Sequence, residues 1–179
     1  REITVGWEDG RQDLAIGDRS LIPPDHQHCI ELARSGKYGP LKVIEAGFGF
    51  KIGDPNQWPV RADLAGGGAL MDVGIYALQA CRYLTGEEPQ AITAQETKTD
   101  PVKFAEVDET ITWTMTMPSG VNCYCNTSYA FSGINRFNAY GDRGWFGLDP
   151  AYSYGGIKGK SKDGPIEMEE IDILIGTFP

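Results

Sequence analysis

A two-residue alternation between positions 110 and 117 is the feature that most constrains the fold of this chain. Its apolar positions are Ile111, Trp113, Met115 and Met117, and its polar positions are Thr110, Thr112, Thr114 and Thr116. Successive side chains of a β-strand point to opposite faces, so the pattern predicts a strand with one apolar and one polar face. Pro118-Ser119-Gly120 then predicts a turn into a second strand over residues 121–131, and hence a hairpin.

Two helices are predicted among further strands. Pro24 opens the first helix, which Gly36 ends, and the second runs over residues 69–84 with Gly86 as its cap. Other strands are expected over residues 41–52, 136–140, 144–148 and 166–173. Together these elements predict an α+β fold, in which a mostly antiparallel, open-faced sheet carries the helices on one face.

Composition fits a single soluble domain and limits its partners. The 179 residues are 41% hydrophobic, which is enough for a core, while 23 glycines and 11 prolines predict many turns. A net charge of −9 argues against nucleic acid, because binding phosphates requires clustered lysine and arginine. No apolar run approaches the ~18 residues of a membrane span, and nothing after Arg1 resembles a signal peptide.

The cysteines and histidines do not form a recognisable metal motif. Cys29 and Cys81 fall in predicted helices, while Cys123 and Cys125 share one face of a predicted strand. With two histidines, His26 and His28, and no Cys-x-x-Cys, we expect no metal site and a solvated His26 and His28. Reduced thiols predict a cytoplasmic protein, or a periplasmic one if a signal segment has been removed.

The most informative motif for chemistry is Gly-Gly-Gly-Ala-Leu-Met-Asp-Val-Gly-Ile-Tyr over residues 66–76. Asp72 and Tyr76 are separated by one helical turn, so both are expected on the same face. The glycines lack Cβ atoms, so a flat ligand or another backbone segment can approach the helix N-terminus closely. In the alternative interpretation, Asp72 complements the helix dipole and Tyr76 belongs to the core.

No cofactor-binding fingerprint occurs in the chain. The nearest glycines, Gly47, Gly49 and Gly53, have the wrong spacing and lead into Asp54-Pro55 rather than into a helix. We interpret them as sites of strand bulges or close backbone contacts.

Three segments resemble a known family. They are Gly-Asp-Pro-Asn-Gln-Trp (53–58), Leu-Ala-Gly-Gly-Gly-Ala-Leu-Met-Asp-Val-Gly-Ile-Tyr (64–76) and Arg-Tyr-Leu-Thr-Gly-Glu-Glu-Pro (82–89). They resemble the Gfo/Idh/MocA oxidoreductases, and the tyrosine that ends the second segment resembles the glucose-fructose oxidoreductase branch. The resemblance extends from about Ile22 to the C-terminus, whereas residues 1–21 fit poorly.

The resemblance implies that residues 22–179 are a substrate-binding and oligomerisation domain, with a Rossmann cofactor domain lying outside this chain. It implies NAD or NADP as cofactor and a sugar or polyol as substrate. Tyr76 would exchange a proton with the sugar hydroxyl, and Asp72 would orient the substrate. Gly67 and Gly68 are expected to contact the cofactor. The lysine of a Glu-Lys-Pro segment, which is absent here, completes the family's site, so we expect the isolated chain to be inactive.

Two residues before the glycines are further candidates for substrate binding. Trp58 could form an apolar wall against a sugar ring, or could equally anchor its loop to the domain. Arg61 could hydrogen-bond a polyol, although charged loop residues are usually just solvated. The acidic positions Glu167, Glu169 and Glu170 are most simply an exposed strand face.

The polar sheet face has two interpretations. Members of the resembled family oligomerise through such a face, which predicts a homo-oligomer; the alternative is a solvated face, which antiparallel sheets tolerate. For the whole protein two functions remain open: a nicotinamide-dependent sugar oxidoreductase, and a non-catalytic sugar-binding or assembly module on the same fold. Retention of both Asp72 and Tyr76 favours the enzyme.

Overall fold

The computed structural model of the chain describes residues 7–8, 11–12, 24–54, 57–131, 133–153 and 155–166. The strands are β1 (Trp7–Glu8), β2 (Arg11–Gln12), β3 (Leu41–Gly49), β4 (Ala91–Thr97), β5 (Thr110–Thr116), β6 (Asn122–Ser128), β7 (Ile134–Gly141), β8 (Trp145–Leu148), β9 (Gly159–Ser161) and β10 (Gly164–Ile166). The helices are α1 (Pro24–Ser35), the 3-10 turn η2 (Trp58–Val60), α2 (Ala62–Ala65), the π-helical turn η3 (Leu70–Gly74) and α3 (Ile75–Thr85).

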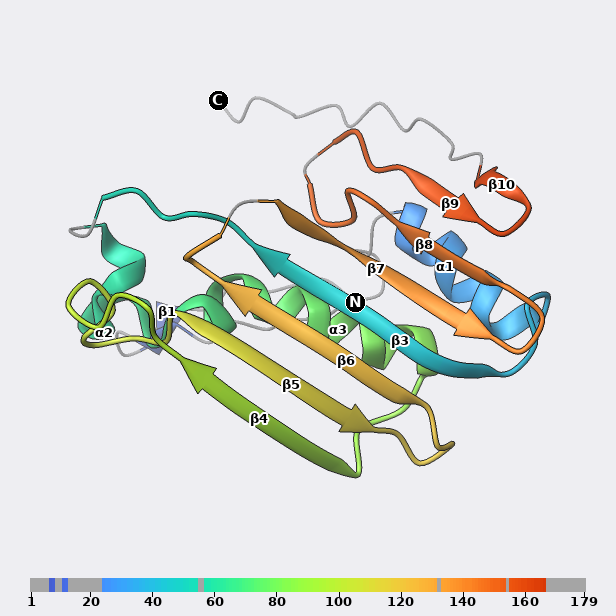
Figure 1. Cartoon of the computed structure of the whole chain (residues 1–179), viewed down its shortest axis with the longest axis horizontal. Coiled ribbons are helices and arrows are strands. Elements are labelled where there is room, and N and C mark those ends of the chain that lie inside the picture. Colours follow the sequence, from blue (N-terminus) through green and yellow to red (C-terminus); the bar gives the residue numbers. More distant parts are fainter. Residues whose placement is uncertain are drawn as a thin grey trace.

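Eight of the strands form one twisted sheet in the order β10-β9-β8-β7-β3-β6-β5-β4 (Figure 1). Only the central pair β3 and β6 is parallel among the described strands, and the other neighbours are antiparallel. The predicted α+β fold with a mostly antiparallel sheet is therefore confirmed.

The predicted hairpin is formed by β5 and β6. Trp113 is paired with Cys125 and Met115 with Cys123, and all four side chains are buried. Thr114 is paired with Tyr124 on the opposite face, where both side chains are exposed. The alternation of the sequence thus divides the sheet into a core face and an open face.

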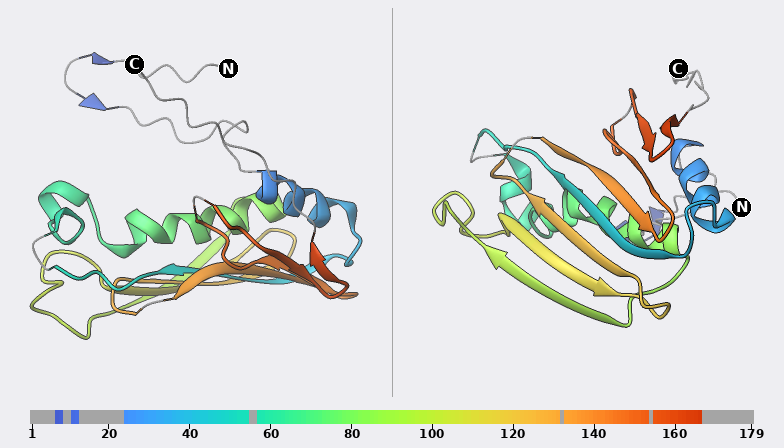
Figure 2. Two further views of the ribbon diagram at one scale, coloured as in Figure 1. Left: turned by 90° about the horizontal axis from the view of Figure 1, so that it is seen from above. Right: turned by 45° about the vertical axis from the view of Figure 1, so that its right-hand side comes forward.

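All the helices lie on one side of the sheet, as the view from above in Figure 2 shows. Helix α3 presents Ala77, Ala80, Cys81 and Leu84 to the core face, where they pack with residues of β3, β5, β6 and β7. Its small side chains allow the helix to approach the sheet closely. The opposite face carries no helix among the described residues.

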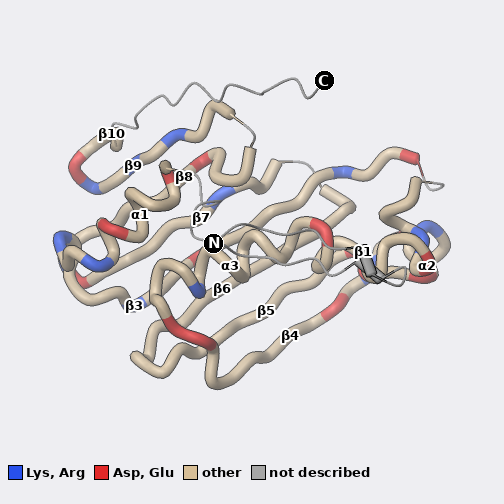
Figure 3. Tube along the Cα trace, turned by 180° about the vertical axis from the view of Figure 1, so that it is seen from behind, with Lys and Arg blue, Asp and Glu red and all other residues tan. Residues whose placement is uncertain are grey.

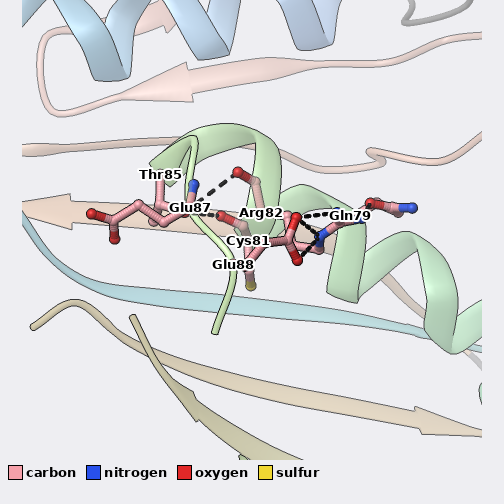
Figure 4. A network of polar contacts seen from close by, with 6 residues as sticks. All are labelled: Gln79, Cys81, Arg82, Thr85, Glu87 and Glu88. Atoms are coloured by element: carbon pink, nitrogen blue, oxygen red, sulfur yellow. Dashed lines mark hydrogen bonds and ion pairs between the residues drawn. The ribbon is translucent and has the colours of Figure 1, made fainter. Parts of the chain in front are cut away.

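Helix α3 ends as the sequence predicts. Gly86 adopts a left-handed conformation (φ 70°) and donates its N–H to the carbonyl of Arg82. Figure 4 shows the polar contacts at this end: the Arg82 guanidinium contacts Glu88 and donates to Gln79 Oε1 at 2.6 Å, and the Thr85 hydroxyl donates to the Cys81 carbonyl at 2.8 Å.

One predicted strand boundary is wrong, and some elements were not predicted. The strand expected over residues 41–52 ends at Gly49, because β7 begins opposite it at Ile134. Beyond Gly49, Phe50 and Ile52 donate only to the carbonyls of Ser128, at the end of β6, and Tyr129 among the described backbone contacts. The helix expected over 69–84 begins with a π-helical turn, and two short helical turns, η2 and α2, precede it. The short β9–β10 hairpin was not predicted. Of the strand expected over 166–173, the part after Ile166 lies outside the described residues, as do Glu167, Glu169 and Glu170.

The segment Ala62–Thr85 is long and apolar enough to pass for a membrane span by composition. In the structure it is divided at Gly66, and its apolar positions from Val73 to Leu84 pack on the sheet. A core helix of a globular domain has this same composition, because it is buried against apolar neighbours. Among the described strands, β4, β5, β6 and β8 carry no Lys or Arg (Figure 3).

The four cysteines are free and buried. Cys81 on α3 and Cys125 on β6 have their sulfur atoms 3.6 Å apart across the helix–sheet interface. His28 is exposed as expected, but the expectation for His26 is wrong: its ring packs against Phe137 and Tyr152. The chain segment after β8 returns Tyr152 to α1, a contact that no local pattern predicts.

Candidate active site

The triple glycine ends one helix and begins the next. Gly66 has a left-handed conformation (φ 69°) that terminates α2. Gly68 is buried, and a Cβ atom there would lie 2.1 Å from the backbone oxygen of Asp108. The sequence left open whether a ligand or another backbone segment approaches the glycines. At Gly68 it is the backbone of Asp108 that does so.

Asp108 also caps the helix. Its carboxylate accepts hydrogen bonds from the N–H groups of Gly68 at 2.7 Å and Leu70 at 2.8 Å. These are the free donors that make a helix N-terminus attractive to anions. Because the carboxylate of Asp108 already occupies them, this N-terminus is not open to a phosphate group.

A π-helical turn carries the acid of the motif. The N–H of Ile75 donates to the carbonyl of Leu70, five residues back, which widens the turn that contains Asp72. Gly74 lies against β6, where a Cβ atom would meet the side chain of Thr127 at 2.9 Å. Such turns occur frequently at functional sites.

The ring of Tyr76 contacts two other aromatic rings and is partly exposed to solvent. Its ring centroid lies 5.7 Å from those of both Phe48 and Tyr152, and the Tyr76 residue is 46% exposed. Tyr76 is therefore not a core residue, although two neighbouring rings restrict its movement. A phenol in this position can present its hydroxyl to a molecule outside the domain.

Asp72 and Tyr76 have different neighbours. Asp72 accepts a hydrogen bond at Oδ2 from the hydroxyl of Tyr129, over 2.8 Å, while Tyr76 contacts rings from β3 and from the segment after β8. The expectation that both lie on one helix face stays a prediction, since no described contact joins them.

The other predicted site residues lie on η2, between η2 and α2, and in the loop before η3. Trp58 is 57% exposed at the start of η2, and the Arg61 side chain forms an ion pair with Asp63 at 2.9 Å. Neither residue contacts Asp72 or Tyr76 through a described hydrogen bond, ion pair or ring contact. Gly67 is half-buried beside Met71, whose Cγ would lie 2.5 Å from an added Cβ. The roles assigned to Trp58, Arg61, Gly67 and Gly68 stay predictions.

Sequence reasoning missed three residues around this site: Asp108, Tyr129 and Tyr152. Each is distant in the sequence from the helix that it contacts, and no local pattern marks it. Burial, followed by the hydrogen bond to Asp72, raises the pKa of Tyr129 well above its ordinary value. Tyr129 therefore stays protonated and acts as a hydrogen-bond donor. Within the described residues, no cluster of three or more His, Cys, Asp or Glu side chains could hold a metal ion.

The structure is thus an α+β domain, in which a helix that carries an acid and a half-exposed tyrosine covers one side of a mostly antiparallel, open-faced sheet. The comparison with protein families identifies which one. The profile of the GFO/IDH/MocA C-terminal domain matches residues 26–147, and the chain belongs to this family. The predicted family is thus confirmed.

Three relatives illustrate the match. The chain is 30% identical over 102 residues to a D-xylose 1-dehydrogenase [NADP(+)] of Haloarcula marismortui, covering 56% of this chain and 28% of the relative. It is 30% identical over 146 residues to a trans-1,2-dihydrobenzene-1,2-diol dehydrogenase of Bos taurus, covering 77% and 42%. The crystal structure of an aldose-aldose oxidoreductase from Caulobacter crescentus, complexed with glycerol, matches with a TM-score of 0.76 and 42% identity, covering 80% and 44%. The chain therefore spans less than half the length of these relatives.

Proposed function

We propose that the protein containing this chain oxidises or reduces a sugar or polyol at a hydroxyl-bearing carbon, with NAD or NADP as the partner in hydride transfer. This chain would supply the substrate side of the site. The observation that carries the proposal is the half-exposed Tyr76 on a helix of a domain 42% identical to part of an aldose-aldose oxidoreductase.

Tyr76 would handle the proton. A hydroxyl-bearing carbon becomes a carbonyl only if the hydroxyl proton leaves as well as the hydride, and a deprotonated tyrosine oxygen within hydrogen-bond distance can accept that proton. In the reverse direction the same oxygen returns the proton to the carbonyl oxygen. Phe48 and Tyr152 restrict the ring of Tyr76, so its hydroxyl is presented with little conformational freedom.

Asp72 would bind and orient the substrate. Its Oδ2 is engaged by Tyr129, which leaves Oδ1 to accept hydrogen bonds from sugar hydroxyl groups. A carboxylate acceptor binds a hydroxyl more strongly than a neutral acceptor does. We assign no proton transfer to Asp72.

The described residues suit the nicotinamide ring of the cofactor but not its diphosphate. Gly67 and the exposed side chain of Met71 form an uncharged surface that suits a flat nicotinamide ring. The helix N-terminus, already capped by Asp108, does not suit the diphosphate. The nicotinamide, when bound, accepts or supplies the hydride. We therefore propose that the phosphates are bound by a Rossmann domain outside these residues, with residues 22–179 as the substrate and oligomerisation domain.

Trp58 and Arg61 remain proposed contacts to the substrate. Trp58 exposes an aromatic face of the kind that packs against sugar rings. The side chain of Arg61, although paired with Asp63, is more than half exposed, and its guanidinium can donate further hydrogen bonds.

We also propose a homo-oligomer formed through the open sheet face. This face holds a shallow hollow of about 550 Å³, lined in part by Thr93, Thr112, Tyr124 and Arg136. Within the described residues, Asn126 Oδ1 in the same hollow is buried without a hydrogen-bond donor. A second copy can supply that donor. The four free cysteines support a cytoplasmic location.

The full-length protein tests the proposed activity. It should reduce NAD or NADP in the presence of some member of a panel of aldoses and polyols, as followed by nicotinamide absorbance. Calorimetric binding of a sugar, without any nicotinamide-dependent oxidation over the whole panel, would favour the non-catalytic sugar-binding module instead.

A further inference from the structure

Contacts with distant residues constrain both the backbone and the side chain of Tyr129. It lies directly after β6, is 1% exposed, and its ring contacts Phe50 edge-on at 5.3 Å and stacks with Phe104 at 6.4 Å. Its N–H donates to the carbonyl of Glu109 at 2.9 Å, and its own carbonyl accepts from Ile52 at 3.0 Å. Backbone and ring are therefore both constrained.

The loop of residues 98–109, between β4 and β5, supplies part of this constraint. Its buried Glu109 accepts hydrogen bonds from the N–H groups of Thr99 and Asp100 and from the hydroxyl of Thr99. Lys103 donates to the carbonyls of Ile52 and Gly53. The contacts of Glu109 stabilise the loop internally, and those of Lys103 attach it to the segment after β3. Together they place Phe104 against Tyr129.

The one polar group of the Tyr129 side chain points at Asp72. Its hydroxyl donates to Asp72 Oδ2 at 2.8 Å, and no other described residue hydrogen-bonds to the Asp72 side chain. A carboxylate with one fixed donor loses its freedom to rotate, so its second oxygen keeps one direction. Asp108 fixes the backbone of the same helix start, through Gly68 and Leu70.

We infer that Tyr129 is a positioning residue that holds the Asp72 carboxylate so that its Oδ1 remains available, in a fixed direction, to a substrate hydroxyl. This inference rests on the proposed function. It adds to that function a residue that touches neither substrate nor cofactor and acts through Asp72.

The test compares Tyr129→Phe, Asp72→Ala and the double variant in the full-length protein. Loss of a hydrogen bond to a charged group corresponds to about a 10- to 100-fold effect, so Tyr129→Phe should lower kcat/KM by that factor, mainly through a higher KM. Added to Asp72→Ala, the same change should cost less than about threefold, because the group it positions is already gone.

Tyr38→Phe is the matched control. Tyr38 is also a buried tyrosine whose hydroxyl donates to a carboxylate, Asp163 Oδ2 at 3.2 Å, but it packs against Phe146 on β8 and not against the candidate site. Its substitution should leave KM and kcat unchanged in both backgrounds. Equal losses on adding Tyr129→Phe to the wild type and to Asp72→Ala would overturn the inference, as would unchanged kinetics in Tyr129→Phe.

Two further measurements apply if Tyr129→Phe does not fold or if the protein shows no activity. If Tyr129→Phe fails to fold, Phe104→Leu loosens the tyrosine while keeping its hydroxyl, and its rise in KM should disappear in the Asp72→Ala background; an unchanged KM would contradict positioning. If the wild-type protein shows no nicotinamide-dependent oxidation, the proposed function fails. Urea unfolding then tests the contact between Tyr129 and Asp72. The losses in free energy of unfolding caused by Tyr129→Phe and Asp72→Ala should be non-additive in the double variant, and additive losses would reject the contact.

Discussion

The backbone of Asp108 occupies the space that a side chain on Gly68 would need, and the carboxylate of Asp108 accepts the hydrogen bond of the Gly68 N–H at 2.7 Å. One residue thus explains both the absence of a side chain at Gly68 and the capping of the helix start. This contact also directs an anionic ligand away from the N-terminus of the helix.

Gly68→Ala should therefore destabilise the domain. An added Cβ atom would lie 2.1 Å from a backbone oxygen that cannot rotate away, and overpacking of this kind costs about 1–3 kcal/mol. Gly53→Ala is the control, since nothing lies within 4 Å of a Cβ there. Urea unfolding of both variants measures the difference, and equal stabilities would contradict the close approach.

Tyr76→Phe should lower kcat of the full-length protein by about 10²–10⁴-fold, because general acid–base steps contribute on that order. The fold and the cofactor affinity should be retained, since the ring still packs against Phe48 and Tyr152. Tyr83→Phe, on the same helix, should leave kcat unchanged. A kcat near that of the wild type in Tyr76→Phe, measured where chemistry limits turnover, would show that the proton is transferred elsewhere.

Asp72→Asn should reduce substrate affinity as well as rate, because a neutral amide is a weaker acceptor for sugar hydroxyl groups than a carboxylate. The predicted result is a higher KM together with a lower kcat in steady-state assays of the full-length protein. An unchanged KM would remove Asp72 from the substrate site and leave it as a partner of Tyr129 alone.

Thr114→Lys should weaken self-association without unfolding the domain. Thr114 is exposed on the open face, opposite Tyr124, and burying an ammonium group in an interface between two copies is costly. Val102→Lys adds the same charge on the exposed loop before β5 and serves as the control. Sedimentation velocity separates the cases, and a wild-type protein that is monomeric at high concentration would reject the interface.

His26 should make stability depend on pH. Burial lowers its pKa from 6.5 to about 4, so the folded chain keeps it neutral while the unfolded chain binds a proton below pH 6.5. This contribution to stability is fully present above pH 6.5 and is lost as the pH falls toward 4. His26→Phe keeps an aromatic ring beside Phe137 and Tyr152 and should lose less stability than the wild type between pH 7 and pH 5, as measured by urea unfolding. An identical loss in both proteins would show that His26 is not the titrating group.

The predictions that came from local patterns agree best with the structure. The alternation of residues 110–117 places Trp113 and Met115 on the core face and Thr114 on the open face, as expected from the period of a strand. Gly86 ends α3 because a left-handed residue is needed there. Boundaries were less accurate where tertiary partners decided them: β3 ends where its neighbour β7 begins, and a π-helical turn replaces the regular first turn of the second helix.

The α+β class, the two faces of the hairpin and the glycine-ended helices follow from the sequence alone, because each depends on residues within a few positions of one another, and the family follows from three short motifs. The neighbours of Asp72 and Tyr76, in contrast, depend on the tertiary structure. Asp108 reaches the helix start from 38 residues away and Tyr129 reaches Asp72 from 57 residues away. These contacts arise because the start of this helix packs against β6 and β3, beside the end of the β5–β6 hairpin where Asp108 and Tyr129 lie. Strand order in a sheet is set by long-range pairing and burial, and the periodicity of one segment carries no information about which distant segment lies next to it.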